Sequence, residues 1–386
     1  MRRRLLFFTI VVMIYALHAT VWAQETGQPI APISLQGQPV HTLLIDPQNP
    51  ENMYALIGAG EKKLWKFGSD ILKTTDGGST WSSILDHILK PSCIAMDPTR
   101  PDYIYVSGEK INQFGVKNAA VFKSTDGGRN WNDGFIVHSD IEGWIYQLEI
   151  SPADPNVLYV ALQRLGQILY RSKDGGENWE AGWSGGVFLI YPDPVDADTL
   201  YILTHDLGRG QSLGVSVDGG ITFDRLKLPN PPVDGEVDSV AITPDHPGTL
   251  YATARHDSEN WVLKSTDSGL TWEAFPIELE QRWRSFRVLG VNPANPNVVY
   301  GDIDRLCAPP CAWSSQLLIS KDSGRNWRSF MGGMEEMNFS ALTFHPNRSE
   351  EIYASTKNGI YMINSGLAVM TDGAKKTTWG EIRSEP

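Results

Sequence analysis

Ser172 to Trp179 reads S-K-D-G-G-E-N-W, and five near copies of this octet occur along the chain. They share the pattern Ser/Thr-x-Asp-x-Gly-x-x-Trp/Phe and begin at Thr74, Ser124, Ser216, Ser265 and Ser320. The aspartates of the six copies are separated by 50, 48, 44, 49 and 55 residues and are Asp76, Asp126, Asp174, Asp218, Asp267 and Asp322. A regular spacing of about 50 residues is typical of a repeat architecture.

A second motif recurs with the same spacing. A turn such as D-P-Q-N-P at residues 46–50 precedes a short apolar segment that opens with tyrosine. This motif occurs seven times, and its tyrosines are Tyr54, Tyr105, Tyr159, Tyr201, Tyr251, Tyr300 and Tyr353. The sequence therefore predicts seven repeats, the last of which has lost its octet.

Each repeat has the pattern of four short strands. An apolar run such as S-V-A-I-T-P at residues 239–244 leads through the proline turn to the tyrosine strand, and a variable stretch then leads to a third strand, the octet and a fourth strand. Short runs of β-branched and aromatic residues between Gly, Pro, Asn and Asp are typical of strands. Seven such units predict an all-β fold, a seven-bladed β-propeller with four-stranded antiparallel blades.

The residues of the octet suit a tight turn between the third and fourth strands. Gly175 and Gly176 allow a positive φ, and Asp174 is able to accept hydrogen bonds from the backbone amides of the turn. Trp179 supplies a large rigid surface for packing between neighbouring blades. We therefore expect the repeated aspartate to hold the turn together, and not to take part in chemistry.

The N-terminus has the features of a signal peptide over residues 1–23. Three arginines (Arg2, Arg3 and Arg4) precede an uncharged apolar run, and Val21-Trp22-Ala23 offers small residues where a signal peptidase reads. We expect cleavage before Gln24 and a secreted or periplasmic protein. An uncleaved anchor is the alternative, because the run is just long enough to span a bilayer.

Composition narrows the classes of partner. The formal net charge is −12, and removal of the three leader arginines would make it −15, which disfavours nucleic acid and anionic membranes. No membrane contact is expected beyond a possible uncleaved anchor. The mature chain would have 386 − 23 = 363 residues. Seven units of about 52 residues account for residues 24–386 as a single domain.

The three cysteines predict one disulfide and one free thiol. Cys307 and Cys311, in C-A-P-P-C, are expected to form a disulfide in an oxidising compartment, although a redox or metal role is an alternative. Cys93 lies in an apolar run and is expected to be a buried free thiol. No metal site is expected, since each D-G-G turn offers a single acidic ligand. No cofactor is expected either, because the sequence lacks a phosphate loop and a nucleotide fingerprint.

The octet resembles the Asp-box, or BNR, motif. Together with the preceding proline turn and tyrosine strand, it makes the chain similar to sortilin/Vps10-type propellers, family 74 glycosidase propellers and photosystem II assembly-factor propellers. This resemblance extends over essentially all of residues 24–386 and implies a propeller fold. In those families the Asp-box is a structural turn remote from ligands, so the resemblance implies the same role for these aspartates.

Antiparallel strands divide the turns between two faces. The octet turns and the proline turns must share one face, and the more variable connections must share the other, where binding residues are usually placed. Aromatic and charged residues in those connections are suited to carbohydrate or peptide recognition, although some of the tryptophans could simply seal blade edges. The candidate ligand-binding residues are Trp65, His138, Asp140, Trp144, Trp183, His205, Arg209, Arg255, His256, Trp283, Arg284, Asp302, Asp304, Arg305 and Trp313.

Two glycosidase alternatives remain open. A sialidase needs converging arginines, for which Arg209, Arg255, Arg284 and Arg305 are available, but the R-I-P signature is missing and seven units exceed the six blades of sialidases. A family 74 enzyme needs two carboxylates across a cleft between two propellers, whereas this chain supplies one propeller. Asp140, Asp302 and Asp304 are therefore poor catalytic candidates. The sequence favours a non-catalytic, exported propeller that binds a protein or a polysaccharide.

Closure of the seventh blade is ambiguous. Its fourth strand could be the local segment Thr378–Ile382, which contains Trp379, or the N-terminal segment Ile33–Gln36. We favour the local segment, because Trp379 repeats the aromatic residue found in the other fourth strands. A closing N-terminal segment would then be at most an added outer strand.

Overall fold

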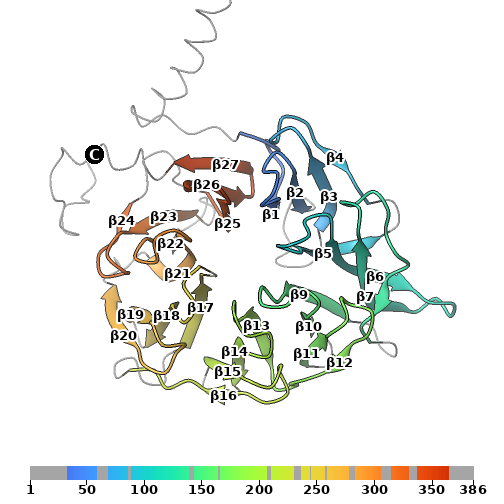
Figure 1. Cartoon of the computed structure of the whole chain (residues 1–386). Coiled ribbons are helices and arrows are strands. Elements are labelled where there is room, and N and C mark those ends of the chain that lie inside the picture. Colours follow the sequence, from blue (N-terminus) through green and yellow to red (C-terminus); the bar gives the residue numbers. More distant parts are fainter. Residues whose placement is uncertain are drawn as a thin grey trace, which may run out of the picture.

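Seven β-sheets form a ring in the computed structural model (Figure 1). Among the residues that the structure describes, six sheets have four strands and the seventh has three. The expected seven-bladed β-propeller is confirmed. The structure describes residues 33–364 apart from residues 59–67, 86–87, 139–142, 164–165, 207–209, 230–235, 244, 257–258, 278–282, 306–313 and 330–336.

The blades follow one another in chain order. Blades 1 to 4 consist of β1 Val40–Ile45, β2 Met53–Gly58, β3 Gly68–Thr74, β4 Ser82–Ser83, β5 Leu89–Met96, β6 Ile104–Ile111, β7 Lys117–Ser124, β8 Phe135–Ile136, β9 Trp144–Ile150, β10 Leu158–Gln163, β11 Gln167–Ser172, β12 Glu180–Ala181, β13 Val187–Pro192, β14 Leu200–Asp206, β15 Gly210–Ser216 and β16 Asp224–Arg225. Blades 5 to 7 consist of β17 Glu236–Ile242, β18 Leu250–His256, β19 Glu259–Ser265, β20 Glu273–Ile277, β21 Trp283–Val291, β22 Val299–Arg305, β23 Ser314–Ser320, β24 Arg328–Ser329, β25 Phe339–His345, β26 Arg348–Thr356 and β27 Gly359–Asn364.

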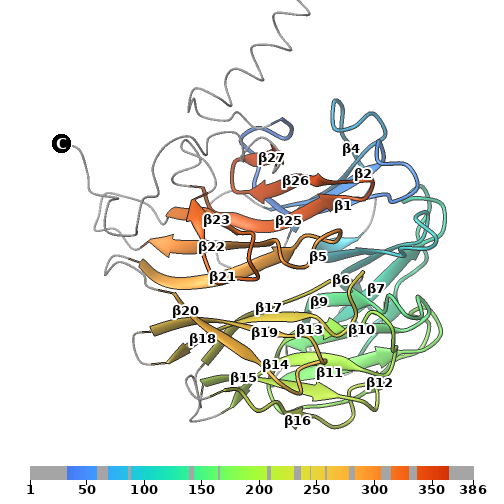
Figure 2. The same cartoon turned by 60° about the vertical axis from the view of Figure 1, so that its left-hand side comes forward.

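The first strand of each blade lies nearest the axis of the ring, and neighbouring blades stack face to face (Figures 1 and 2). We call these the inner strands: β1, β5, β9, β13, β17, β21 and β25. Consecutive strands are antiparallel in every blade, as in blade 3. The octet turns therefore lie on one face, the octet face, and the connections between second and third strands lie on the opposite face, the loop face.

Apolar contacts between neighbouring blades form the core. Five of the seven motif tyrosines are fully buried: Tyr105, Tyr159, Tyr201, Tyr251 and Tyr300. Tyr54 of blade 1 packs in one cluster with Ile104 of blade 2, and Tyr353 of blade 7 packs in another with Val40 of blade 1. Burial of these side chains joins each blade to the next, and the last blade to the first.

The side chains of the octet close its turn. In blade 3, Ser172 Oγ donates to Asp174 Oδ1 at 2.8 Å and accepts from the amide of Gly176 at 2.9 Å. Asp174 Oδ1 also accepts from the amides of Glu177 and Asn178, and its Oδ2 accepts from Asn178 Nδ2 at 2.7 Å. In the other five octets the aspartate likewise accepts from the first hydroxyl and from the amide four residues further on. The carboxylates are thus occupied within their own turns.

The backbone of the turn needs the left-handed conformation. Gly175 and Gly176 have φ values of 70° and 90°, which glycine adopts without steric cost. Ser268 and Ser323 take the position of the first glycine in their octets and still adopt φ values of 59° and 64°. The amide of Gly175 donates to Asn156 O at 2.8 Å, so the octet turn is anchored to the proline turn of its own blade.

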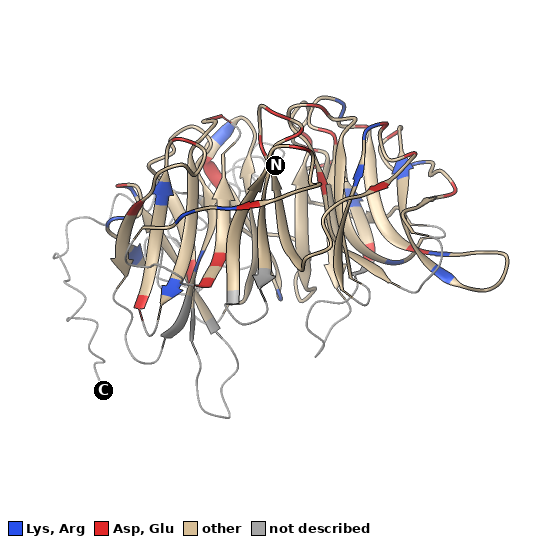
Figure 3. Cartoon of the chain, turned by 90° about the horizontal axis from the view of Figure 1, so that it is seen from below, with Lys and Arg blue, Asp and Glu red and all other residues tan. Residues whose placement is uncertain are grey.

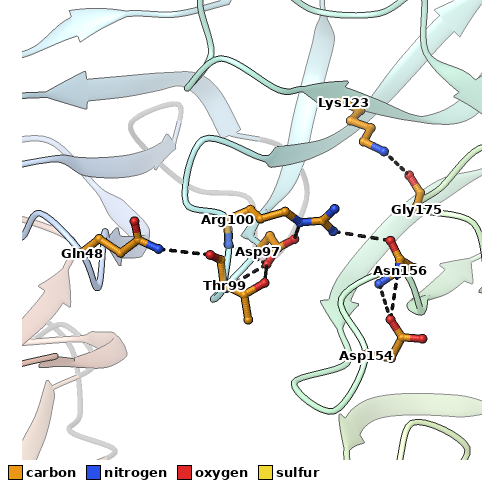
Figure 4. Close-up of polar contacts among 8 residues, drawn as sticks. All are labelled: Gln48, Asp97, Thr99, Arg100, Lys123, Asp154, Asn156 and Gly175. Carbon is orange, nitrogen blue, oxygen red and sulfur yellow. Dashed lines mark hydrogen bonds and ion pairs between the residues drawn. The ribbon is translucent and has the colours of Figure 1, made fainter.

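Polar contacts on the octet face also connect neighbouring blades (Figure 4). Gln48 of blade 1 donates to Thr99 O of blade 2, and Arg100 of blade 2 reaches Asn156 Oδ1 of blade 3. Lys123 Nζ of blade 2 donates to Gly175 O of blade 3 at 3.2 Å. The octet face is therefore a continuous set of turn-to-turn contacts through blades 1 to 3.

The N-terminal segment pairs with the outer edge of blade 7. Ile33 N donates to Ile360 O at 2.8 Å, and Ile360 N donates to Ser34 O at 3.0 Å. In blade 1 the corresponding hydrogen bond runs from Ile84 N to Ile71 O. Ile71 is paired with the residue two positions after the motif tyrosine of its blade, and Ile360 is paired in the same way in blade 7. The N-terminal segment Ile33–Gln36, which the sequence favoured less, is therefore the one found at this edge. The favoured segment Thr378–Ile382 lies outside the described residues.

Ser34 also completes the contact between blades 7 and 1. Its Oγ donates to Gly78 O at 2.8 Å and accepts from Trp81 Nε1 at 2.5 Å. In the next blade, Trp131 Nε1 donates to Ile84 O. The N-terminal segment thus contacts the tryptophan of the following blade as an ordinary fourth strand does.

Bulges in the inner strands change the direction of their side chains. A register irregularity occurs in the inner strand of every blade, and in β9 and β17 the extra residues are Tyr146 and Asp238. A bulge re-aims a side chain and disrupts the two-residue alternation. Tyr146 Oη donates sideways to Val187 O of the next blade, and Val288 N donates to Ser239 Oγ.

Candidate functional site

The structure places the side chains of six of the candidate ligand-binding residues. Four candidates, Trp65, Asp140, Arg209 and Trp313, lie outside the described residues, as do the disulfide candidates Cys307 and Cys311. The backbone of five more belongs to β14, β21 or β22, but their side chains are not described: His205, Trp283, Arg284, Asp304 and Arg305. The six that can be examined are His138, Trp144, Trp183, Arg255, His256 and Asp302.

The aromatic candidates that the structure describes in blades 2 and 3 are His138, Trp144 and Trp183. His138 Nδ1 lies 3.1 Å from Tyr170 Oη, and Trp144 pairs with Gln163 at the loop-face end of β9. Trp183 packs edge-on against Phe223 at a ring distance of 5.9 Å. Phe223 replaces the tryptophan of the other octets, so Trp183 fills space between blades 3 and 4.

Arg255 and Asp302 belong to a set of charged side chains on blades 5 and 6. We call this set the charged cluster: Glu236, Asp238, Arg255, Arg287 and Asp302. Arg255 Nη2 lies 2.6 Å from Glu236 Oε2 and 4.0 Å from Asp238 Oδ1. Arg287 makes a bidentate contact with Asp302, at 3.2 Å from Nε to Oδ1 and 2.7 Å from Nη2 to Oδ2.

Strand pairing explains how the charged cluster forms. Glu236 is opposite Arg255 in the β17–β18 pair, and Arg287 is opposite Asp302 in the β21–β22 pair. Opposite charges at directly facing positions stabilise a sheet. Because β17 and β21 are inner strands, three members of the cluster lie close to the axis. Glu236 opens β17 and therefore stands at the loop face.

The members of the charged cluster differ in their access to solvent. The side chain of Asp302 is fully buried, whereas those of Arg255 and Arg287 are 36% and 33% exposed. Asp302 therefore orients Arg287 and is not itself accessible to a ligand. A guanidinium group that is held by one carboxylate and still partly exposed is suited to a second bidentate acceptor on a partner.

Asp238 lies between the two arginines. Burial raises the pKa of this carboxyl group, an effect that the charges of Arg255 and Arg287 oppose and that of Glu236 reinforces. Its Oδ2 atom is buried and has no hydrogen-bond partner among the described residues. A buried acceptor without a donor carries a free-energy cost in the folded protein.

Glu149 is a second unusual carboxyl group near the axis. It lies in the inner strand β9, is half-buried, and accepts a hydrogen bond from Gln147 Nε2 at 2.9 Å. Burial raises its pKa to about 7, and Gln147 only partly offsets this effect. The carboxyl group therefore changes charge near neutral pH.

Cys93 is a free, half-buried thiol. Burial raises its pKa to about 12, so it remains protonated at neutral pH.

Within the described part of the chain, no group of three or more His, Cys, Asp or Glu side chains is arranged to hold a metal ion. No helix in that part is long and apolar enough to cross a membrane.

Sequence comparison relates the chain to propellers of two kinds. Residues 167–286 match the family model described as Sortilin, neurotensin receptor 3 (Sortilin-Vps10). The chain is 27% identical over 246 residues to the xyloglucanase Xgh74A of Acetivibrio thermocellus, an alignment that covers 60% of the chain and 25% of that protein. A Paenibacillus xyloglucanase is 25% identical over 268 residues, which are 60% of this chain and 26% of that protein. The chain thus spans about a quarter of the length of these curated relatives.

Structural comparison again finds GH74 enzymes, and it adds YCF48 propellers. The Niastella koreensis GH74 enzyme superposes with a TM-score of 0.62 and 17% identity, over 87% of this chain and 53% of that one. YCF48 from Cyanidioschyzon merolae superposes with a TM-score of 0.59 and 14% identity, over 86% and 97% of the two chains. YCF48 bound to D1 peptide gives a TM-score of 0.56 at 15% identity, over 87% and 99%. At these identities the superpositions establish the shared propeller fold.

Proposed function

We propose that this chain is an exported, non-catalytic β-propeller that binds a protein or polysaccharide partner through its loop face. In this proposal residues 1–23 are the export signal, residues 24–386 are the single propeller domain, and the protein acts in a secreted or periplasmic location. The octet aspartates have a structural role, and the partner contacts the charged cluster at the loop-face end of blades 5 and 6.

The observation that carries this proposal is the pairing within the charged cluster. Arg255 is held by Glu236 at 2.6 Å and remains about one-third exposed. The side chain of Asp238, next to it, is 19% exposed. A fixed donor beside a partly exposed carboxylate is complementary to a partner that carries both kinds of group, as peptide backbones and sugar hydroxyls do.

The comparisons support both classes of partner. YCF48 is described in complex with the D1 peptide, and xyloglucanases are by name enzymes of a polysaccharide. A peptide bound on the loop face of this chain would correspond to the first case, and a glycan would correspond to the second. The remaining loop-face candidates could extend the same surface around the ring: Trp65, His138, Asp140, Trp144, His205, Arg209, His256, Trp283, Arg284, Asp304 and Arg305.

A glycosidase is the second candidate function, and its support is the 27% identity to a xyloglucanase. Such an enzyme needs two carboxyl groups that reach the scissile bond from opposite sides. Asp302 does not fit this requirement, because it is fully buried and held by Arg287. Asp302 is therefore not suited to be one of the two carboxyl groups of such an enzyme.

The proposal predicts that Arg255→Ala weakens partner binding about tenfold or more, the usual scale for loss of a charge-assisted bidentate contact. Binding is measured for the purified protein against a glycan array and against extracellular extract from the producing cells. Arg255 is preferred to Arg287, because loss of Arg287 would leave Asp302 buried and unpaired.

Arg325→Ala is the matched control. Arg325 forms an equally short ion pair with Glu273 at 2.7 Å, but it belongs to an octet on the opposite face. Unchanged binding by Arg255→Ala, or equal losses in the two variants, would contradict the assignment of the binding surface. Reproducible cleavage of xyloglucan by the unaltered protein would contradict the non-catalytic part of the proposal.

A further inference from the structure

The hairpin formed by β6 and β7 carries an apolar tip. Each strand has eight residues, and the hairpin extends outside the ring of blades (Figure 1). Phe114 is 80% exposed, and Ile111 and Val116 are exposed as well. Leu89 of the adjacent strand β5 adds a fourth exposed apolar side chain. We call Ile111, Phe114 and Val116 the hairpin tip. Contiguous exposed apolar side chains on a soluble domain usually mark a surface of interaction.

Hydrogen bonds hold the hairpin tip in one conformation. Asn112 Oδ1 accepts from the amides of Phe114 and Val116, each at 2.9 Å. The amide of Asn112 donates to Val116 O, and Gly115 N donates to Asn112 O, also at 2.9 Å. Because the turn is already ordered, little conformational entropy is lost when the tip is inserted into another medium.

Lysines surround the base of the hairpin tip. Lys90 and Lys117 both approach Glu109, at 2.7 Å and 3.9 Å, and Lys110 Nζ donates to Gly134 O. Lys90 and Lys117 are each nearly half exposed. Among the described residues, this region holds three lysines and two carboxylates, Glu109 and Asp133, which leaves a small positive excess although the whole chain is acidic.

The acidic residues of the protein do not cancel this local charge. Acidic residues are frequent along one rim of the ring (Figure 3). The six octet aspartates lie in the turns of the octet face. The hairpin tip lies at the loop-face end of two eight-residue strands, about 26 Å from the octet face. This separation is more than twice the Debye length of about 8 Å at physiological ionic strength.

We infer that the hairpin tip inserts into the interfacial region of an anionic lipid membrane, with Lys90, Lys110 and Lys117 at the level of the head groups. The tip is a narrow convex projection, which a fluid interface accommodates without a preformed pocket. Apolar side chains immediately beyond a set of lysines match the depth profile of such an interface. The sequence alone suggested no membrane contact outside the leader. That expectation rested on net charge, which does not describe this region.

The test uses the full chain with Gln113→Cys, labelled with an environment-sensitive fluorophore. Vesicles are phosphatidylcholine with about 30% phosphatidylglycerol, or phosphatidylcholine alone. We expect a blue shift of the label emission with anionic vesicles and a much smaller shift with neutral ones. Phe114→Ser in the labelled chain should lower the partition coefficient about tenfold, and Lys117→Glu should lower it several-fold.

Val217→Cys provides the matched control, since Val217 is 72% exposed on an octet turn of blade 4. The unsubstituted chain treated with the fluorophore reports any labelling of its own cysteines. Absence of a shift at position 113 with anionic vesicles, or an equal shift at position 217, would overturn the inference. The inference would also be overturned if the emission of the label at position 113 shifted only when a protein from the producing cells was added. The hairpin tip would then bind in a protein pocket.

Discussion

At the scale of single residues, the octet aspartate acts on its own turn. Asp174 accepts hydrogen bonds from Ser172, Glu177 and Asn178, and these bonds lower the pKa of its carboxyl group against the effect of burial. The same kind of bonding lowers the pKa values of Asp76, Asp126 and Asp218 to about 2. Stability from these groups is therefore present above about pH 4 and is lost as the pH falls toward 2.

Asp174→Ala should lower the free energy of unfolding by about 1 to 3 kcal/mol, because the amides of the turn lose their acceptor. Chemical denaturation measures the change, and Lys173→Ala, an exposed neighbouring substitution, should have little effect. Partner binding should be retained. A variant that melts normally but no longer binds would show that the aspartate contacts the ligand.

Glu149 should make the free energy of unfolding decrease as the pH rises, which is opposite to the effect of the octet aspartates. Its folded-state pKa of about 7 is above the ordinary value of 4.5, so its contribution is fully present below pH 4.5 and is lost as the pH rises through 7. Glu149→Gln should therefore leave the free energy of unfolding nearly unchanged at pH 4.5 and raise it at pH 8 by about 2 to 3 kcal/mol. Equal effects at both pH values would refute the raised pKa.

At the scale of strands, the N-terminal segment takes part in blade 7. Deletion of residues 24–36 should lower the melting temperature sharply, because Ile33 and Ser34 supply the hydrogen bonds at the outer edge of β27 and to Trp81. Deletion of residues 373–386 is the comparison, measured by calorimetry. Tolerance of the first deletion together with collapse after the second would restore the local segment Thr378–Ile382 as the closing strand.

The strands themselves could be predicted from the sequence, and part of the site could not. The octet and tyrosine motifs fix the turns, so the inner strand of every blade was located correctly, as in β17. Asp238 was missed because the bulge that makes it an extra residue of β17 cannot be located from the sequence. Glu236 and Arg287 were missed because their partners are set by cross-strand register. Opposite charges at facing positions were the available signal.

At the scale of the whole molecule, the ring separates its chemistry between two faces. Bonded aspartates and turn-to-turn contacts occupy the octet face, whereas the charged cluster and the hairpin tip belong to the loop face and its outer edge. The vesicle and partner-binding experiments use different variants, so either proposal can fail without the other.

The pairing of Ser34 with Ile360 also bears on how the protein is made. The first segment of the domain to be synthesised bonds to its last blade, across 326 residues. Loop closure over such a distance is slow, and it cannot begin on the ribosome until almost the entire chain has emerged. The position of the closing strand thus delays closure of the ring until nearly the whole domain has been synthesised.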